Sequence, residues 1–165
     1  MIVIIDFGSQ TAHLIGRRLR QLGVASKYVD PTDVLEAIRK KKPHGIILTG
    51  GPASVYEKGA PAVSKKIFYQ GIPVLGICYG WQLMAKLLGG DVKNTQKEYG
   101  PQSLMLIQNS SLFSLPKKEF SVFMSHGDTV VALPEGFTVI GSTRSVPNTA
   151  VADEKRKLFG VQFHP

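Results

Sequence analysis

The sequence lacks several features that mark particular classes of protein. Its 165 residues include one cysteine, Cys78, so no disulfide can form within the chain. No apolar run approaches the roughly 20 residues of a membrane-spanning helix. Residues 1–6 lack the basic region and the cleavage site of a signal peptide. We therefore expect a soluble, cytoplasmic protein with no membrane partner.

The sequence also lacks the usual signatures of metal, nucleotide and nucleic-acid sites. No histidine, cysteine and carboxylate cluster has metal-ligand spacing, and no G-x-x-x-x-G-K-[ST] loop is present. The net charge is +8, with its densest cluster at 39–42. Because no aromatic residues interleave that cluster, we interpret it as a solvated helix end and expect no nucleic-acid partner. No metal or cofactor is expected in this chain.

The length and composition predict one domain covering residues 1–165. Hydrophobic residues make up 43% of the chain and charged residues 19%, which is typical of a globular protein. A chain of this length leaves little room for a second core.

The first half of the chain alternates between strand-like and helix-like segments. Strands are expected at 2–6, 24–29, 45–48 and 73–77, and helices at 10–22, 33–41, 62–69 and 79–88. Continuous apolar runs are typical of strands buried on both faces. Alternation at this spacing predicts a doubly wound α/β fold, with parallel strands and flanking helices.

The second half contains short strand-like runs separated by turns. They lie at 104–107, 122–124, 129–133, 138–140 and 158–163. Such runs are typical of antiparallel strands. We therefore expect a mixed sheet that is mostly parallel, with its antiparallel strands in the second half.

Cys78 lies where an expected strand meets an expected helix. The stretch Gly76-Ile77-Cys78-Tyr79-Gly80 has the G-x-nucleophile-x-G form of a nucleophile elbow, with cysteine in place of serine. Flanking glycines allow the backbone to approach closely, and the helix N-terminus is expected to lower the pKa of the thiol. We predict that Cys78 is a nucleophile; a buried structural cysteine is the alternative.

A thiol nucleophile needs a base, for which the chain offers four histidines. His13 and His44 are expected at the surface, on a helix and in a loop. His164 follows an expected strand, and Pro165 keeps it extended. Since ligands of α/β sheets bind at the carboxyl ends of strands, where Cys78 also lies, we predict His164 to be the base.

A second glycine-rich turn, 49–52, follows the third expected strand on the same edge of the sheet. Attack on a carboxamide creates an oxyanion that needs preorganised N–H donors. Gly51 and Tyr79 can present such backbone donors, although a tight turn with no catalytic role is the alternative for Gly51.

Two of these segments resemble the nucleophile and histidine motifs of class I (triad) glutamine amidotransferases. They are 76–82 (GICYGWQ) and 160–165 (GVQFHP), and the resemblance extends over the chain in the family's order. Three further segments resemble the subfamily of GMP synthase glutaminase domains. They are 6–10 (DFGSQ), 48–55 (LTGGPASV) and 124–128 (MSHGD).

The resemblance implies a flavodoxin-like fold and a set of site residues. It implies Cys78 and His164 as the catalytic pair and the amides of Gly51 and Tyr79 as the oxyanion hole. It implies that glutamine is bound by Gln82 and by the backbone around Ser125, His126 and Gly127. The ammonia released is expected to pass to an ATP-dependent synthetase domain or subunit that aminates XMP to GMP, with ATP and Mg²⁺ in that partner.

Two positions depart from the family pattern. The family continues H-P-E, where the glutamate orients the histidine, whereas this sequence ends at Pro165; we expect a C-terminal truncation that removes the third catalytic residue. Trp81 stands where methionine is usual, and we expect it to alter helix packing rather than chemistry.

Three alternative functions stay open. The chain could serve another amidotransferase, for anthranilate, aminobenzoate or carbamoyl phosphate synthesis. It could be a thiol hydrolase or isomerase of the same fold, without a synthetase. It could be a non-enzymatic binding module in which Cys78 is structural.

Overall fold

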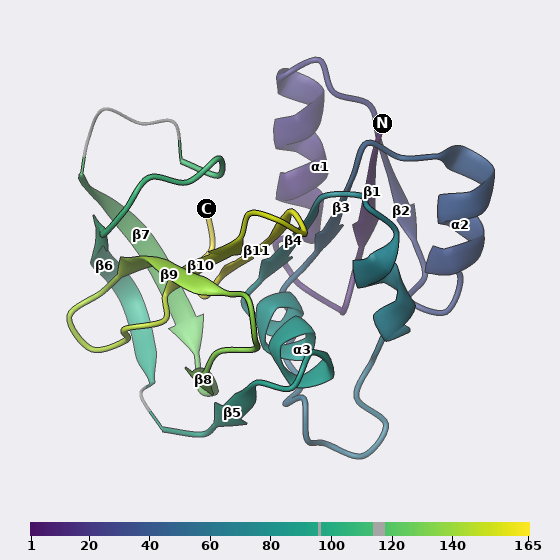
Figure 1. Ribbon diagram of the computed structural model, residues 1–165. Coiled ribbons are helices and arrows are strands. Elements are labelled where there is room, and N and C mark those ends of the chain that lie inside the picture. The colour runs from purple at the N-terminus through teal and green to yellow at the C-terminus, as the bar shows by residue number, and fades with distance from the viewer. Residues whose placement is uncertain (96, 114–117) are drawn as a thin grey trace.

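One large mixed sheet organises the computed structural model, which describes residues 1–95, 97–113 and 118–165. Within those residues the sheet has nine strands in the order β2-β1-β3-β4-β11-β10-β9-β6-β7, and β5 and β8 form a separate pair (Figure 1). The strands are β1 (Ile2–Ile5), β2 (Ser26–Val29), β3 (Gly45–Leu48), β4 (Val74–Ile77), β5 (Asp91–Lys93), β6 (Glu98–Leu106), β7 (Glu119–His126), β8 (Thr129–Ala132), β9 (Thr138–Ser142), β10 (Ala150–Asp153) and β11 (Leu158–Val161). The helices are α1 (Ala12–Gln21), α2 (Val34–Lys41), the 3-10 helix η1 (Lys65–Tyr69) and α3 (Tyr79–Leu87).

The first four strands are parallel, as the sequence predicted. β1 pairs with β2 and with β3, and β3 pairs with β4, all in parallel register. Their carboxyl ends therefore share one edge of the sheet, and the loops after β1, β3 and β4 meet there.

The antiparallel half begins at β10 rather than at the middle of the sequence. β11 comes late in the chain but runs parallel to β4, while β10, β9, β6 and β7 pair antiparallel in turn. The predicted mixed, mostly parallel sheet flanked by helices is confirmed. β5 and β10 were not expected from the sequence, and β6 and β7 are longer than the runs that predicted them.

Helices cover both faces of the parallel half. Alternate side chains of each strand point to opposite faces, so each strand packs against helices on both sides. Val74 packs in a cluster with residues of α2, η1 and α3, whereas Leu75 and Ile77 pack in a second cluster that includes Ile15 of α1. In Figure 1, α3 lies below β4 and β11 in the view. Among the described residues, no helix has the length and apolar character needed to cross a bilayer.

The helix expected at 62–69 is wrong in its extent and type. Only Lys65–Tyr69 is helical, and that segment is a 3-10 helix. Ser64 is extended, with φ −66° and ψ 130°, and its hydroxyl accepts a hydrogen bond from the Lys66 amide at 3.4 Å. This cap starts the helix three residues later than the apolar pattern suggested.

Candidate active site

A cavity of about 620 Å³ opens at the carboxyl edge of the parallel strands, where the two halves of the sheet meet. Seven of the eight residues predicted for the site line it: Gly51, Cys78, Gln82, Ser125, His126, Gly127 and His164. Tyr79, the eighth, lies directly after the cysteine at the start of α3. Segments far apart in the sequence are therefore brought together around one thiol.

Cys78 occupies a strained turn between β4 and α3. Its φ of 50° and ψ of −107° place it outside the regions that L-residues favour, and it is the N-cap of α3. Its amide donates to the Val161 carbonyl at 2.8 Å, which ties the turn to β11. A Cβ on Gly80 would overlap the Leu48 carbonyl, and one on Gly76 would lie 2.7 Å from the Trp81 nitrogen. The glycines of the motif thus permit the close approach that the elbow requires.

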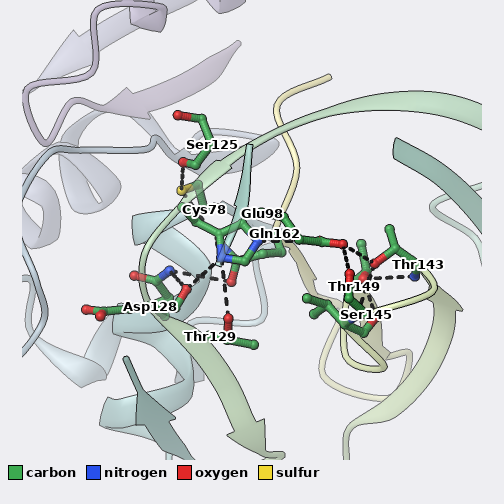
Figure 2. Close-up of polar contacts among 12 residues, drawn as sticks. Cys78, Glu98, Ser125, Asp128, Thr129, Thr143, Ser145, Thr149 and Gln162 are labelled. Atoms are coloured by element: carbon green, nitrogen blue, oxygen red, sulfur yellow. Dashed lines mark hydrogen bonds and ion pairs between the residues drawn. The ribbon is translucent and has the colours of Figure 1, made fainter. Parts of the chain in front are cut away.

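The thiol is buried among weak hydrogen-bonding partners. Its sulfur lies 3.7 Å from the Ser125 carbonyl oxygen and 3.6 Å from the Gln162 side-chain nitrogen (Figure 2). Burial raises the pKa of Cys78 to about 11, and the Tyr79 amide and Gln162 offset only part of this effect. The expected lowering of the cysteine pKa is therefore wrong for the free site, because desolvation outweighs the donors at the helix N-terminus. The resting cysteine is a thiol at neutral pH.

His164 faces the same glycine as the cysteine does. A Cβ placed on Gly50 would lie 3.0 Å from Cε1 of His164 and 3.6 Å from Cβ of Cys78. The His164 amide donates to the Phe123 carbonyl at 2.9 Å, which fixes the backbone against β7. Burial, and then the nearby His126, lower the pKa of His164 below its ordinary value of 6.5. The imidazole is consequently neutral at neutral pH, the state in which it can accept a proton.

The other two histidines are at the surface, as predicted. His13 and His44 are both exposed, and His44 Nδ1 lies 3.2 Å from the N-terminal nitrogen. Neither lines the cavity beside Cys78. The sequence-based choice among the histidines is consistent with this placement.

The two predicted oxyanion donors come from the turn after β3 and from the start of α3. A Cβ on Gly51 would lie 2.7 Å from the Phe7 carbonyl oxygen, so only glycine fits there. The Tyr79 amide is close enough to Cys78 to lower its pKa. The Tyr79 side chain points elsewhere, because its hydroxyl donates to the Pro61 carbonyl at 2.5 Å and its ring packs 5.2 Å from that of Phe7. Only the backbone of Tyr79 is therefore available to the cavity.

Gln82 connects α3 to the loop after β7. Its side-chain nitrogen donates to the Asp128 carbonyl at 2.8 Å and lies 3.4 Å from the Gln162 side-chain oxygen. Gln162 in turn reaches the thiol. Sequence analysis assigned no role to Gln162 although it lies inside the histidine motif, two residues before His164. Its position in that motif was the only feature of the sequence that could have indicated a role for Gln162.

His126 lines the cavity, and its side chain is buried. Its Nδ1 lies 3.0 Å from the Asp128 carbonyl oxygen, and its Nε2 lies 3.6 Å from a Glu98 carboxylate oxygen. Sequence analysis missed Glu98, because a single acid at the start of a strand carries no pattern. Only the pairing of β6 with β7, which sets Glu98 opposite His126, reveals it.

Trp81 does not form part of the cavity lining. Its side chain is fully buried, packs 5.4 Å from the ring of Phe137, and lies where a Cβ on Gly160 would clash with the indole. This supports the expectation that Trp81 alters packing rather than chemistry.

Comparisons with known proteins agree with this geometry. The family model for class-I glutamine amidotransferases matches residues 3–165. Two curated relatives are GMP synthases (glutamine-hydrolyzing): one of Aquifex aeolicus, 47% identical over 165 residues, and one of Streptomyces coelicolor, 50% identical over 166 residues. Each alignment covers 99% of this chain but only 32% of the relative. A crystal structure from Thermoplasma acidophilum, of a candidate GMP synthase subunit, is similar, with a TM-score of 0.87 and 30% identity. That similarity covers 99% of this chain and 83% of the other.

Proposed function

We propose, from the premise that this chain belongs to the class-I glutamine amidotransferase family, that it is the glutaminase part of a GMP synthase. In this proposal it hydrolyses glutamine to glutamate and ammonia through a thioester on Cys78. The observation that carries the proposal is that Cys78, in a strained turn with φ 50°, lines the same cavity as His164.

The chemistry follows from the protonation states of the two groups. The raised pKa of the thiol leaves the resting proton on sulfur, and the lowered pKa of His164 leaves the imidazole free to accept it. The sulfur therefore gives its proton to His164 as it attacks the carboxamide carbon. The amides of Gly51 and Tyr79 stabilise the oxyanion. Collapse of the tetrahedral intermediate breaks the C–N bond, and His164 returns its proton to the departing ammonia. Water, deprotonated by His164, then cleaves the thioester to release glutamate and the thiol.

Glutamine recognition is proposed to involve α3 and the loop after β7. Gln82 and the backbone of Ser125, His126 and Gly127 are proposed to contact the substrate. The carboxylates of Glu57 and Asp128 also line the cavity, and either complements the α-ammonium group of an amino acid. The cavity therefore offers both neutral amides and negative charge to an amino-acid substrate.

The acceptor of the ammonia is proposed to lie outside this chain. The chain spans about a third of the length of the GMP synthases it matches. We propose that a synthetase domain or subunit uses ATP and Mg²⁺ to aminate XMP to GMP with this ammonia, and that the process is cytoplasmic.

Three rates test the proposal in the full-length protein: glutamate release, GMP formation from glutamine, and GMP formation from ammonium. Cys78→Ala should lower the first two by about four orders of magnitude or more, because it removes the nucleophile. The ammonium-dependent rate should stay at the wild-type level. A glutamine-analogue chloroketone should alkylate Cys78 of the wild type, and excess glutamine should protect it.

Other results would reject the proposal. Glutamate release that persists in Cys78→Ala would make the cysteine structural. Glutamate release without GMP formation would favour another amidotransferase, and assays with the corresponding synthetases would identify it.

A further inference from the structure

The buried pair Glu98 and His126 lies outside the proposed chemistry but adjoins the substrate loop. Glu98 begins β6 and His126 ends β7, and the two residues are direct partners in the antiparallel register. Their side chains are 3% and 1% exposed. A carboxylate and an imidazole are seldom buried this completely without a partner that compensates the loss of water.

Glu98 is held from the side away from the cavity. One carboxylate oxygen accepts a hydrogen bond from the Thr143 hydroxyl at 3.0 Å, and Ser145 donates to the same oxygen. Both residues lie in the turn between β9 and β10, and Figure 2 shows their contacts with Glu98. The other oxygen has no hydrogen-bond partner among the described residues, and the nearest basic group is His126 Nε2 at 3.6 Å.

The far side of the His126 ring is held by the chain that follows β7. Nδ1 lies 3.0 Å from the Asp128 carbonyl oxygen and 3.4 Å from the Thr129 hydroxyl oxygen. Nε2, on the opposite side of the ring, faces the Glu98 carboxylate at 3.6 Å. The imidazole therefore bridges Glu98 and the loop 125–128.

The held imidazole anchors the loop that forms the cavity wall. The Asp128 carbonyl that accepts from His126 also accepts from Gln82 at 2.8 Å. Ser125, just before the histidine, places its carbonyl 3.7 Å from the Cys78 sulfur. The Asp128 carboxylate is fixed separately by the Asn94 side chain at 2.9 Å.

We infer that Glu98 is a positioning residue for glutamine binding, acting through its buried contact with His126, which fixes the loop 125–128. Glu98 does not line the cavity and touches neither the substrate nor the thiol. The inference rests on the proposed function, since it presumes that loop 125–128 binds glutamine. It predicts that loss of the carboxylate weakens substrate binding while leaving the chemical step intact.

The test compares Glu98→Gln with Glu119→Gln in the full-length protein. Glu119 supplies the matched control. It is an exposed carboxylate of the same hairpin and accepts a hydrogen bond from the Ser103 hydroxyl at 2.5 Å. Glu98→Gln should raise the KM for glutamine about tenfold, with kcat within about threefold, because a ground-state contact is lost. Glu119→Gln should leave both constants unchanged, and Glu98→Asp should recover part of the KM.

A spectroscopic measurement distinguishes loss of the contact between Glu98 and His126 from a general packing defect. In protein labelled with ¹⁵N-histidine, Glu98→Gln should change the ring-nitrogen chemical shifts of His126, and Glu119→Gln should leave them at the wild-type values. Ser145→Ala removes one anchor of Glu98 at an exposed position, so it should raise KM in the same direction by less. That variant keeps the inference testable if Glu98→Gln fails to fold.

The outcomes separate this inference from the proposed function. If the wild type releases no glutamate, the proposed function fails. If the wild type is active but Glu98→Gln lowers kcat at unchanged KM, or changes neither constant, the positioning role is rejected. Ring-nitrogen shifts of His126 that stay unchanged in Glu98→Gln also reject it.

Discussion

The two halves of the sheet build the site by different physical means. In the parallel half, β3, β4 and α3 approach so closely that glycine is required at the contacts, and the turn at Cys78 takes a strained φ of 50°. In the antiparallel half, β6 and β7 present the loop 125–128 through buried hydrogen bonds and one acid–imidazole pair. Cys78 is therefore held by backbone packing, and the loop 125–128 is held by polar contacts.

This difference predicts how each half tolerates change. Close-packed backbone cannot yield to an added atom, because neighbouring main chain cannot rotate away. Polar contacts between side chains are lost one at a time and can be partly replaced by a similar group. The nucleophile elbow should therefore fail abruptly, and the loop 125–128 should weaken in steps.

The largest expected effect is that of Gly80→Ala in the parallel half, compared with Gly127→Ala in the antiparallel half. At Gly80 a Cβ would overlap the Leu48 carbonyl, so Gly80→Ala should lower the free energy of unfolding by about 3 kcal/mol or more. At Gly127 a Cβ would meet only Asn94 at 3.5 Å and Tyr99 at 3.7 Å. Gly127→Ala should therefore cost less than about 1 kcal/mol. Urea denaturation monitored by circular dichroism measures both.

A loss of stability in Gly80→Ala as small as that in Gly127→Ala would break the comparison. Such a result would mean that α3 can move away from β3 without cost. Retention of the glutaminase activity in Gly80→Ala would add that the elbow does not depend on that close contact.

The sequence predicted the parallel half better than the antiparallel half for a physical reason. Strands buried on both faces, such as 45–48, are continuous apolar runs, and glycines mark their turns. β10 reads Ala-Val-Ala-Asp, which is short and has small side chains, and only pairing with β9 and β11 identifies it. The parallel partner of β4 is likewise invisible in the sequence, since β11 is separated from it by the whole antiparallel half.

The site follows the same division. Cys78 and Gly51 were found from local motifs, because an elbow and a tight turn are encoded by neighbouring residues. Glu98 and Gln162 act through contacts 28 and 84 residues away in the chain, with His126 and Cys78. The raised cysteine pKa was also missed, since burial depends on the fold around the thiol.

The titration of Cys78 gives an intermediate effect. An unfolded thiol titrates near 9.0 and the folded one near 11, so between these pH values the unfolded state holds fewer protons. Stability that is fully present below pH 9.0 should be lost as the pH rises toward 11, by about 2–3 kcal/mol. Cys78→Ala lacks this titration, so the stability difference between wild type and variant should fall by that amount over the same range.

Other titrating groups cancel in that difference because both proteins contain them. Urea denaturation at several pH values gives the curve, and the rate of iodoacetamide alkylation reports the thiolate directly. A flat difference together with fast alkylation at neutral pH would show that the helix N-terminus overcomes burial. The elbow would then hold a preformed thiolate, and His164 would not be needed to deprotonate it.

The smallest expected effect is at an exposed polar cluster of the antiparallel half. The Glu154 carboxylate accepts from the Ser110 hydroxyl at 2.7 Å and from the Ser111 amide and hydroxyl at 2.9 and 2.6 Å, which lowers its pKa. Water can replace these partners, so Glu154→Gln should cost less than about 1 kcal/mol and leave the KM for glutamine unchanged. Thermal unfolding and glutamate release measure the two. A rise in KM equal to that of Glu98→Gln would mean that any carboxylate of this half supports the loop, and that burial beside His126 gives Glu98 no special role.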